Sequence, residues 1–572
     1  MGTLIYNLMY MRQGHGGRGF NQETFEKVLF WVNFELQRIM ICYDQQGFFT
    51  NYCVPDTESV WLTSWSLIVL KDAIDPVWEL NGIFIDPVMV NNVVIWLISQ
   101  QNAVNGSFSE PRGIVYDRKF ISNYTVDWDG SLVQLNLSLT AQCLIALKVN
   151  SDLRGGNAST IVSTAIIKAR MYLEQHFTKI TDAFERSIVT YALHVSNSPM
   201  RDIAFQILNQ TKHKNKYGVY WSNWPIPQMK VYWPSKNPRQ NWKPESEYEG
   251  NAVAATSYAL LTHIIRAEYY NKYEIMNWIQ TQRSHVGAFI STYDSILAHK
   301  ALVLYAISTG DSIQNYNMVI NLSSSSSSEL DINEIEINDE NIIELQEYDI
   351  QNVWGNLLVN GQGTGYALVQ LRVEYNVEYP WQIRKAPYNG FNMSVQTYLH
   401  GRNFSHIDYH VCLSWLPQNT QKLYSNRSGH AQFEIEIPTG YRLEEQYLKD
   451  KIGVLRNLGD GENMPGPQVN FLFDFVDFDP ICFEFVLQRY IPVANLSRYY
   501  SMKIFEYHEP TNADRGMYTL RDVFGLDICE VCGSYQCPYC PYYAYAISSY
   551  QFYPFLSFLL FVFVLVSYNF IY

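Results

Sequence analysis

The cysteines are the residues of this sequence whose spacing most directly suggests chemistry. Nine cysteines occur in 572 residues, and four of them form a Cys-x2-Cys, x4, Cys-x2-Cys cluster at Cys529, Cys532, Cys537 and Cys540. Such a cluster can hold a metal ion or form disulfides, and a gap of four residues is short for a zinc ribbon. We therefore expect disulfides here, and we expect no metal site and no cofactor in this chain. Disulfides in turn indicate an oxidising compartment.

Asn-x-Ser/Thr sequons agree with that compartment, because each can accept a glycan in a secreted chain. They start at Asn105, Asn123, Asn136, Asn157, Asn209, Asn321, Asn392, Asn403, Asn426 and Asn495. The first twenty residues lack the continuous apolar stretch and the small-residue cleavage site of a signal peptide. The protein is therefore either cytosolic or lacks its natural beginning, and the cysteines favour the second.

The acidic residues define what the surface can bind. The formal charge of -14 argues against a nucleic-acid partner, because phosphate contacts need a basic surface. After Ser323–Ser328, an acidic stretch reaches Asp349 without one basic residue. We expect a solvated loop there, since isolated carboxylates without a fixed cage bind cations weakly.

The C-terminal residues form an apolar tail directed to a membrane. No Lys or Arg follows Arg521, and residues 554–572 are almost continuously apolar. Without flanking basic residues a stop-transfer anchor is poorly supported, and a GPI-addition signal with its small-residue site between Ala544 and Ser549 fits better. A conventional membrane span and a mistranslated end stay open as alternatives.

Helices must position whatever the first half of the chain carries. From about Phe25 to Tyr305 apolar residues recur at helical spacing. In one such helix Asp86 can cap the first amide groups and Pro87 suits the first turn. Helices with small residues on one face are predicted at 61–70, 139–147, 189–195 and 254–264. Small residues permit close packing, and the alternation with amphipathic helices suggests a closed α/α ring.

A repeated motif punctuates these helices. Trp96, Gln100, Gln101, Gly106 and Phe108 are echoed, with a shift of one residue, by Trp278, Gln282, Arg283, Gly287 and Phe289. A weaker copy contains Gly47 and Phe48. Each copy predicts a helix, a glycine turn and a phenylalanine that returns to the core.

Two families combine such a ring with Gln…Gly-x-aromatic turns. In the terpenoid cyclases an Asp-rich motif ionises an isoprenoid, and only DWDG at residues 127–130 faintly resembles one. A lone pair of aspartates usually lies in a solvated loop, and no constellation of carboxylates suited to acid catalysis is visible. We therefore do not expect an enzyme.

The other family is the alpha-macroglobulin and complement superfamily, which residues 1–525 resemble. The resembling segments of the helical half are the helices WLTSWSLIVLKDA (61–73) and EGNAVAATSYALL (249–261), the loop NGSFSEPRGIVYD (105–117) and the segment QRSHVGAFISTYDSILAHKAL (282–302). GTGYALVQLRVEYNV (363–377) resembles the end of a CUB domain, with Leu371, Val373 and Tyr375 alternating as in a half-buried strand. FEIEIPTGY (433–441), CFEFVLQRYIPVANL (482–496) and KIFEYHEP (503–510) are similar to the receptor-binding macroglobulin domain.

This resemblance implies a multidomain fold. It consists of an α/α toroid of the thioester type at 1–306, a CUB portion at 307–380 with an insertion at 321–350, a receptor-binding β-sandwich at 381–525, a Cys-rich segment at 526–546 and the apolar tail at 550–572. Cys412 and Cys482 resemble the disulfide of the receptor-binding domain. Cys42 and Cys53 are close enough in the sequence for a local disulfide.

Family members that act covalently carry Gly-Cys-Gly-Glu-Gln, whose Cys and Gln side chains form a thioester. No such string occurs here, and in the family it lies shortly before a segment resembling Ile5–Met11. Truncation and true loss of the thioester explain its absence equally. Some complement-type members activate the thioester with a His, and the matching residue here is Tyr116. Tyrosine, with an ordinary pKa of about 10, is a poor substitute for imidazole. If a thioester lies upstream, we expect amines to attack it directly. The alternative is that Tyr116 is an ordinary packed aromatic.

The resemblance implies a secreted or GPI-tethered protein with endopeptidase-inhibitor or opsonin-type function in innate immunity, similar to the GPI-anchored macroglobulin-like surface antigens. Its partners would be proteases, microbial or cell surfaces and a receptor for the β-sandwich, with a possible membrane tether. The rival hypothesis is a thioester-less interaction protein or coreceptor on the cell surface. The toroid cyclase ranks third.

Overall fold

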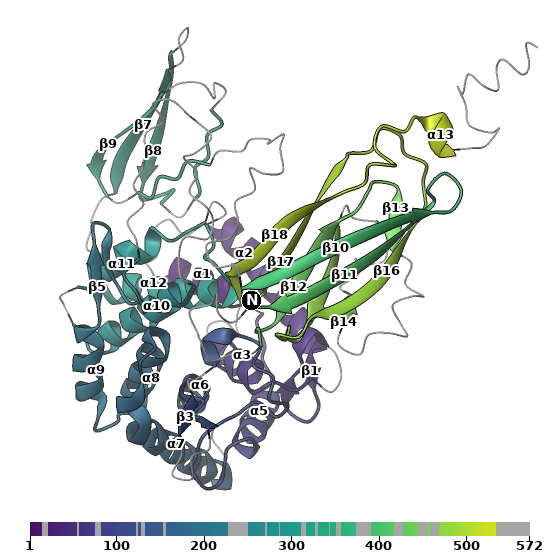
Figure 1. Cartoon of the computed structure of the whole chain (residues 1–572). Coiled ribbons are helices and arrows are strands. Elements are labelled where there is room, and N and C mark those ends of the chain that lie inside the picture. The colour runs from purple at the N-terminus through teal and green to yellow at the C-terminus, as the bar shows by residue number, and fades with distance from the viewer. Residues whose placement is uncertain are drawn as a thin grey trace, which may run out of the picture. The chain divides into compact units, whose positions relative to one another are not determined.

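The computed structural model describes most of the chain in two compact units. The described residues are 1–13, 21–53, 57–74, 82–121, 124–126, 132–152, 156–226, 250–268, 271–284, 287–309, 316–325, 330–342, 344–350, 356–365, 367–372, 390–416, 427–443, 455–457 and 468–532. One unit comprises Met1–Tyr375 with Glu506–Thr511, and the other comprises Asn376–Phe505 with Asn512–Tyr572. Figure 1 shows helices dominating the purple to teal part of the chain and strands the green to yellow part.

Helices build most of the first unit. They are α1 (Gly2–Gln13), α2 (Gln22–Ile41), α3 (Val60–Ala73), α5 (Pro87–Ser99), α6 (Leu137–Val149), α7 (Gly156–His176), α8 (Ala183–Val195), α9 (Arg201–Gln210), α10 (Gly250–Ile265), α11 (Lys272–Gln280) and α12 (Thr292–Thr309). Side chains cap the free amide groups at the start of α2, α3, α5 and α8. Asp86 accepts a hydrogen bond from Val88 N, with Pro87 in the first turn of α5, as the sequence predicted.

The helices rich in small residues lie in the interior, as expected. Each helix contacts the next in the series α1, α3, α6, α8, α10 and α12, and α12 also contacts α1. Alanines of α6, α8 and α10 are fully buried along these contacts, among them Ala141, Ala192 and Ala255. Their small side chains let the helix axes approach closely, and one continuous apolar core results.

Short hairpins join the helices. Their strands are β1 (Tyr43–Asp44) with β2 (Phe48–Phe49), β3 (Tyr124–Val126) with β4 (Leu132–Gln134), and β5 (His213–Asn215) with β6 (Gly218–Tyr220). A short 3-10 helix, η3 (Arg118–Phe120), lies between α5 and α6.

A three-stranded sheet completes the first unit and corrects the prediction of an acidic loop. Its order is β8-β7-β9, from β7 (Asn317–Ser325), β8 (Leu330–Asn338) and β9 (Asn356–Thr364). In β8 the exposed Glu334 and Glu336 alternate with the half-buried Ile335 and Ile337. This alternation is a strand signal, and the acidic composition hid it.

The prediction of a strand around Leu371 is also wrong for the residues that the structure describes. Residues 367–372 belong to no strand, and Leu371 is 58% exposed. Val373 and Tyr375 lie outside the described residues. The strand that the structure describes in this region is β9, which ends at Thr364.

The second unit is built from two antiparallel sheets. Their orders are β10-β11-β16-β13 and β14-β15-β12-β17-β18. The strands are β10 (Phe391–His400), β11 (His406–Trp415), β12 (Ala431–Glu436), β13 (Tyr441–Leu443), β14 (Leu455–Asn457), β15 (Gln468–Phe473), β16 (Ile481–Arg489), β17 (Tyr499–Glu506) and β18 (Glu509–Thr519). One apolar core contains side chains of both sheets, as in a β-sandwich, and the Phe471 and Phe485 ring centroids lie 5.0 Å apart within it.

The chain beyond this sandwich is described only as far as Cys532. A short helix, α13 (Ile528–Cys532), carries Cys529 and Cys532. The apolar tail at 550–572 lies outside the described residues. Among the residues that the structure does describe, no helix combines the length and apolar character needed to cross a bilayer.

Candidate functional site

The repeated motif fixes the loop that leads to Tyr116. Gln101 Nε2 donates to the carbonyl oxygens of Gly106 and Ala165, each at 3.0 Å. Phe108 is fully buried, and its backbone N–H donates to Thr140 Oγ1 of α6 at 3.0 Å. The turn is thus bonded to the inner helix that follows it.

The same bond recurs wherever the motif occurs. The backbone N–H groups of Phe49, Phe108, Trp221 and Phe289 donate to Thr63 Oγ1, Thr140 Oγ1, Thr256 Oγ1 and Ser295 Oγ, each at 3.0 Å. Phe49 rather than Phe48 is therefore the returning aromatic of the weaker copy. The copy at Gly218–Trp221 was not identified in the sequence, and its bonded aromatic, Trp221, lies three residues after the glycine, one more than in the other copies.

The next residue of interest on this loop is Glu110, which sequence reasoning did not single out. Its carboxylate accepts hydrogen bonds from Val60 N at 3.0 Å, Trp61 N at 2.7 Å and the Ser59 hydroxyl at 3.3 Å. It thereby caps α3, where the helix dipole also favours negative charge. Burial raises the pKa of Glu110 to about 7, against these hydrogen bonds, which lower it. In the sequence, the signal for this role is that an acidic residue stands six residues before Tyr116, in a loop otherwise rich in turn residues.

Tyr116 itself lies in the core and is 2% exposed. The following residue, Asp117, begins η3 by accepting a hydrogen bond from Lys119 N at 3.0 Å. At the position that resembles the thioester-activating His, the structure therefore has a buried phenol just before a short 3-10 helix.

A buried charge cluster adjoins this turn. Lys119 Nζ lies 3.7 Å from Asp117 Oδ2 and 3.5 Å from Asp294 Oδ2, and none of the three side chains is exposed. Burial alone would lower the pKa of Lys119, but the two carboxylates outweigh it and raise that pKa above its ordinary value. Burial raises the pKa of Asp294 to about 6, although Lys119 opposes the rise. Asp294 lies in α12, so this partner is brought to Lys119 only by the tertiary fold.

Among the residues that the structure describes, six cysteines are disulfide-bonded and one is a free thiol. Disulfides join Cys42 to Cys53 and Cys412 to Cys482. Cys529 and Cys532 are also disulfide-bonded. Cys143 is a free thiol, fully buried, and burial raises its pKa well above the ordinary value, so it is not a reactive nucleophile.

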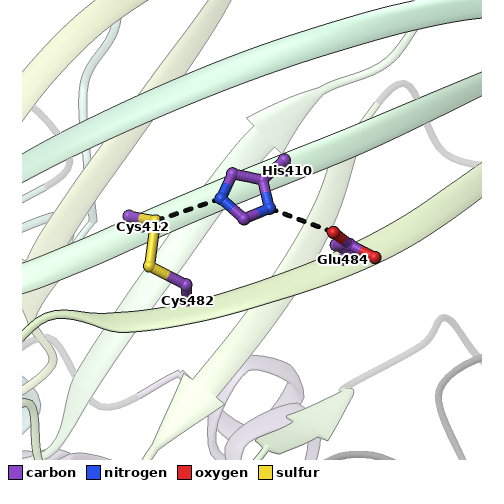
Figure 2. Close-up of a disulfide and its surroundings, with 4 residues drawn as sticks. All are labelled: His410, Cys412, Cys482 and Glu484. Carbon is purple, nitrogen blue, oxygen red and sulfur yellow. Dashed lines mark hydrogen bonds and ion pairs between the residues drawn. A yellow bond between two sulfur atoms is a disulfide. The ribbon is translucent and has the colours of Figure 1, made fainter.

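The Cys412–Cys482 disulfide lies between two strands of the second unit. The two cysteines face each other directly in the antiparallel pairing of β11 and β16. His410 lies beside the disulfide, between Cys412 and Glu484, as Figure 2 shows. Sequence reasoning had not considered either flanking residue.

The other candidate residues are distributed over the surface. Asn105, Asn392 and Asn495 are exposed, whereas Asn136, Asn209, Asn321 and Asn403 are half-buried. Asn157 lies in α7. Asn123, Asn426, Cys537, Cys540 and the aspartates of DWDG lie outside the described residues.

Comparison with known proteins matches both units. Residues 1–305 match the model of the A-macroglobulin TED domain, and residues 426–519 match that of the A-macroglobulin receptor binding domain. Thioester-containing protein 1 allele R1 of Anopheles gambiae is 24% identical over 84% of this chain and 31% of its own length. Ovostatin of Gallus gallus is 25% identical over 69% of this chain and 24% of its own length.

The chain thus spans about a third or less of the length of these curated relatives. The TED-domain match alone covers more than half of the chain. The chain belongs to the alpha-macroglobulin and complement family.

Proposed function

We propose that this chain supplies the thioester-type helical domain and the receptor-binding domain of an extracellular, macroglobulin-type protein that captures proteins through their amines. The capture would make it an endopeptidase inhibitor in innate defence rather than an opsonin of hydroxyl-rich surfaces. The buried Tyr116 carries this choice. A phenol is mostly protonated at neutral pH, with an ordinary pKa of about 10, so it cannot replace imidazole as the nucleophile that attacks the thioester and frees the thiolate to activate a hydroxyl.

The finer architecture belongs to the same proposal. The helical unit is the α/α toroid, with a boundary near residue 306, and the sheet β8-β7-β9 is part of a CUB portion that extends to about 380. The return of helix contacts from α12 to α1 supports the toroid. The β-sandwich would present the surface that a cell-surface receptor recognises.

Methylamine incorporation tests the capture mechanism. The full-length protein that contains this chain should incorporate labelled methylamine covalently. Its thioester should react poorly with glycerol, a hydroxyl acceptor. Tyr116→His should raise the transfer to glycerol, whereas the control Tyr116→Phe should leave both acceptors unchanged. Absence of methylamine incorporation would favour the rival function, a thioester-less interaction protein or coreceptor at the cell surface.

The family assignment argues against the terpenoid cyclase, and we propose that the chain is not an enzyme. We also propose that it is extracellular and tethered by a GPI anchor. Phosphatidylinositol-specific phospholipase should then release it from intact cells. Persistent attachment after this treatment would contradict the GPI anchor without affecting the proposed capture mechanism.

A further inference from the structure

The Cys412–Cys482 disulfide lies on the solvent-facing side of the sheet β10-β11-β16-β13. Along β11 and β16, alternate residues such as Val411 and Phe483 enter the core. The residues between them face away from it, and there Cys412 is half-buried and Cys482 exposed. A solute can therefore reach the sulfur atoms without any opening of the sandwich.

His410 is aimed at this disulfide by its partner on the neighbouring strand. His410 pairs directly with Glu484, just as Cys412 pairs with Cys482 two residues further along β11. His410 Nδ1 lies 3.2 Å from Glu484 Oε1, and His410 Nε2 lies 3.4 Å from Cys412 Sγ. Figure 2 shows the two ring nitrogens turned to these two partners. Because a carboxylate only accepts hydrogen bonds, Nδ1 donates to Glu484, and in the neutral ring Nε2 then carries the lone pair on the side of the sulfur.

We propose that reduction of this disulfide creates a binding site for a thiolate-seeking divalent metal such as Zn²⁺. The ligands are Cys412 Sγ, Cys482 Sγ and His410 Nε2, and water completes the tetrahedron. The ligand atoms of these three residues lie within 4.8 Å of one another. Zinc bonds of about 2.3 Å to sulfur and about 2.0 Å to nitrogen require a sulfur–nitrogen separation of about 3.5 Å in a tetrahedron. The observed 3.4 Å between Nε2 and Cys412 Sγ already meets this requirement.

Glu484 fits the role of a residue that orients a metal-bound imidazole. Histidines that bind metals through one ring nitrogen usually donate the other N–H to a carboxylate, which fixes the ring and makes it a better ligand. The bond from His410 Nδ1 to Glu484 provides this arrangement before any metal is present.

The chemistry balances with a dithiol as the reductant. The dithiol supplies two electrons and two protons, the bond between Cys412 and Cys482 breaks, each cysteine becomes a thiol, and the dithiol becomes a disulfide. The metal then binds both sulfur atoms and displaces both thiol protons into solvent, while Nε2 contributes a lone pair without losing a proton. The backbone pairing of β11 with β16 does not depend on the sulfur bond, so the backbone of the three ligands keeps its place, and rotation of the cysteine side chains separates the sulfur atoms to about 3.8 Å, as a tetrahedral zinc site requires.

The Cys42–Cys53 disulfide provides an internal control. Among the described residues, the group around His410 is the only one in which three His, Cys, Asp or Glu ligands come this close. Reduced Cys42 and Cys53 would therefore present two thiols without a third protein ligand from the described part of the chain.

The test is residue-specific alkylation of the full chain. The protein is reduced with a dithiol, freed of the reductant, incubated with or without Zn²⁺, treated with N-ethylmaleimide and mapped by mass spectrometry. We expect zinc to slow alkylation of Cys412 and Cys482 together at least about tenfold, and to leave Cys42 and Cys53 unaffected. His410→Thr should abolish this protection, and Glu484→Gln should weaken zinc binding about 10- to 100-fold. His406→Thr, on the same strand, should leave the protection unchanged.

Several results would overturn the proposal. One is equal alkylation of Cys412 and Cys482 with and without zinc, and another is undiminished protection in His410→Thr. Loss of the near-ultraviolet circular dichroism of the β-sandwich on reduction would show that the ligands do not keep their places. Equal zinc binding by the oxidised protein would show that the site does not depend on reduction.

Discussion

Glu110 shows how a single residue can couple the helical unit to pH. Its carboxyl is 8% exposed and accepts two backbone N–H bonds and one hydroxyl bond at the start of α3. Burial nevertheless raises its pKa to about 7, above the ordinary value of 4.5. The folded state therefore holds this proton more tightly than the unfolded state does.

This pKa predicts how stability changes with pH. As pH rises from 5 to 8, the unfolded chain loses the Glu110 proton before the folded chain does, so the free energy of unfolding falls. Relative to Glu110→Gln, which is neutral throughout, wild type should lose up to about 3 kcal/mol over this range. Urea unfolding of both proteins at both pH values measures the difference. Glu26→Gln, an exposed carboxylate of α2, should change little, and a flat difference for Glu110→Gln would contradict the prediction.

Lys119 gives a second prediction at the residue scale. Its ammonium lies within 4 Å of the Asp117 and Asp294 carboxylates, and all three side chains are fully buried. Lys119→Met should lower the free energy of unfolding by about 3–5 kcal/mol, because it leaves two carboxylates buried without this cation. The triple variant Asp117→Asn, Lys119→Met, Asp294→Asn should recover part of the loss in urea unfolding. A loss in Lys119→Met no larger than in the triple variant would show that the charge cluster is not responsible.

At the scale of elements, the glycine turns hold the outer helices in place. Gly106 has a φ of +82°, and a Cβ there would lie 2.7 Å from the backbone of Lys168 in α7. Gly287 occupies the same place in its own copy, with a φ of +75°, and a Cβ there would meet nothing within 4 Å. Both turns need the left-handed conformation, but only Gly106 also needs the absence of a side chain.

This difference predicts unequal effects of the same substitution. Gly287→Ala should cost about 1–2 kcal/mol, the strain of a left-handed alanine. Gly106→Ala should cost more, because α7 must also move away from the turn. Thermal unfolding of the two variants, compared with wild type, measures both costs. Equal costs would mean that the contact with Lys168 contributes nothing.

The elements also show which helices, strands and turns could be predicted from the sequence. The helix at Pro87–Ser99 was predicted from its cap and its proline, and the structure buries its apolar stripe of Val90, Val93, Val94 and Leu97. The strand β8 was missed because acidic composition was given more weight than alternation. The copy of the turn at Gly218–Trp221 was missed although Tyr220 follows its glycine at the usual spacing. What the four copies share is a hydrogen bond to a hydroxyl of the helix that follows, which sequence spacing does not show.

At the scale of the whole molecule, burial predicts which sequons carry glycans. On secretion behind a signal peptide, the exposed Asn105, Asn392 and Asn495 should be highly occupied. Asn209 lies in α9 and its amide oxygen is buried, so its occupancy should be low. Enzymatic deglycosylation in heavy-oxygen water followed by peptide mapping measures each site. High occupancy at Asn209 with the exposed sites empty would contradict the prediction.

The sequence by itself determined the family, the helical and β-rich halves, and the helices whose caps and apolar stripes are local in the chain. Local patterns suffice for these because a helix satisfies its hydrogen bonds within a few residues. Only the tertiary structure decided that Glu110 caps α3, that Asp294 reaches Lys119, and that Glu484 bonds to the His410 ring beside the disulfide. These partners are 49, 175 and 74 residues apart in the chain, so packing and strand register bring them together, and no local spacing encodes that.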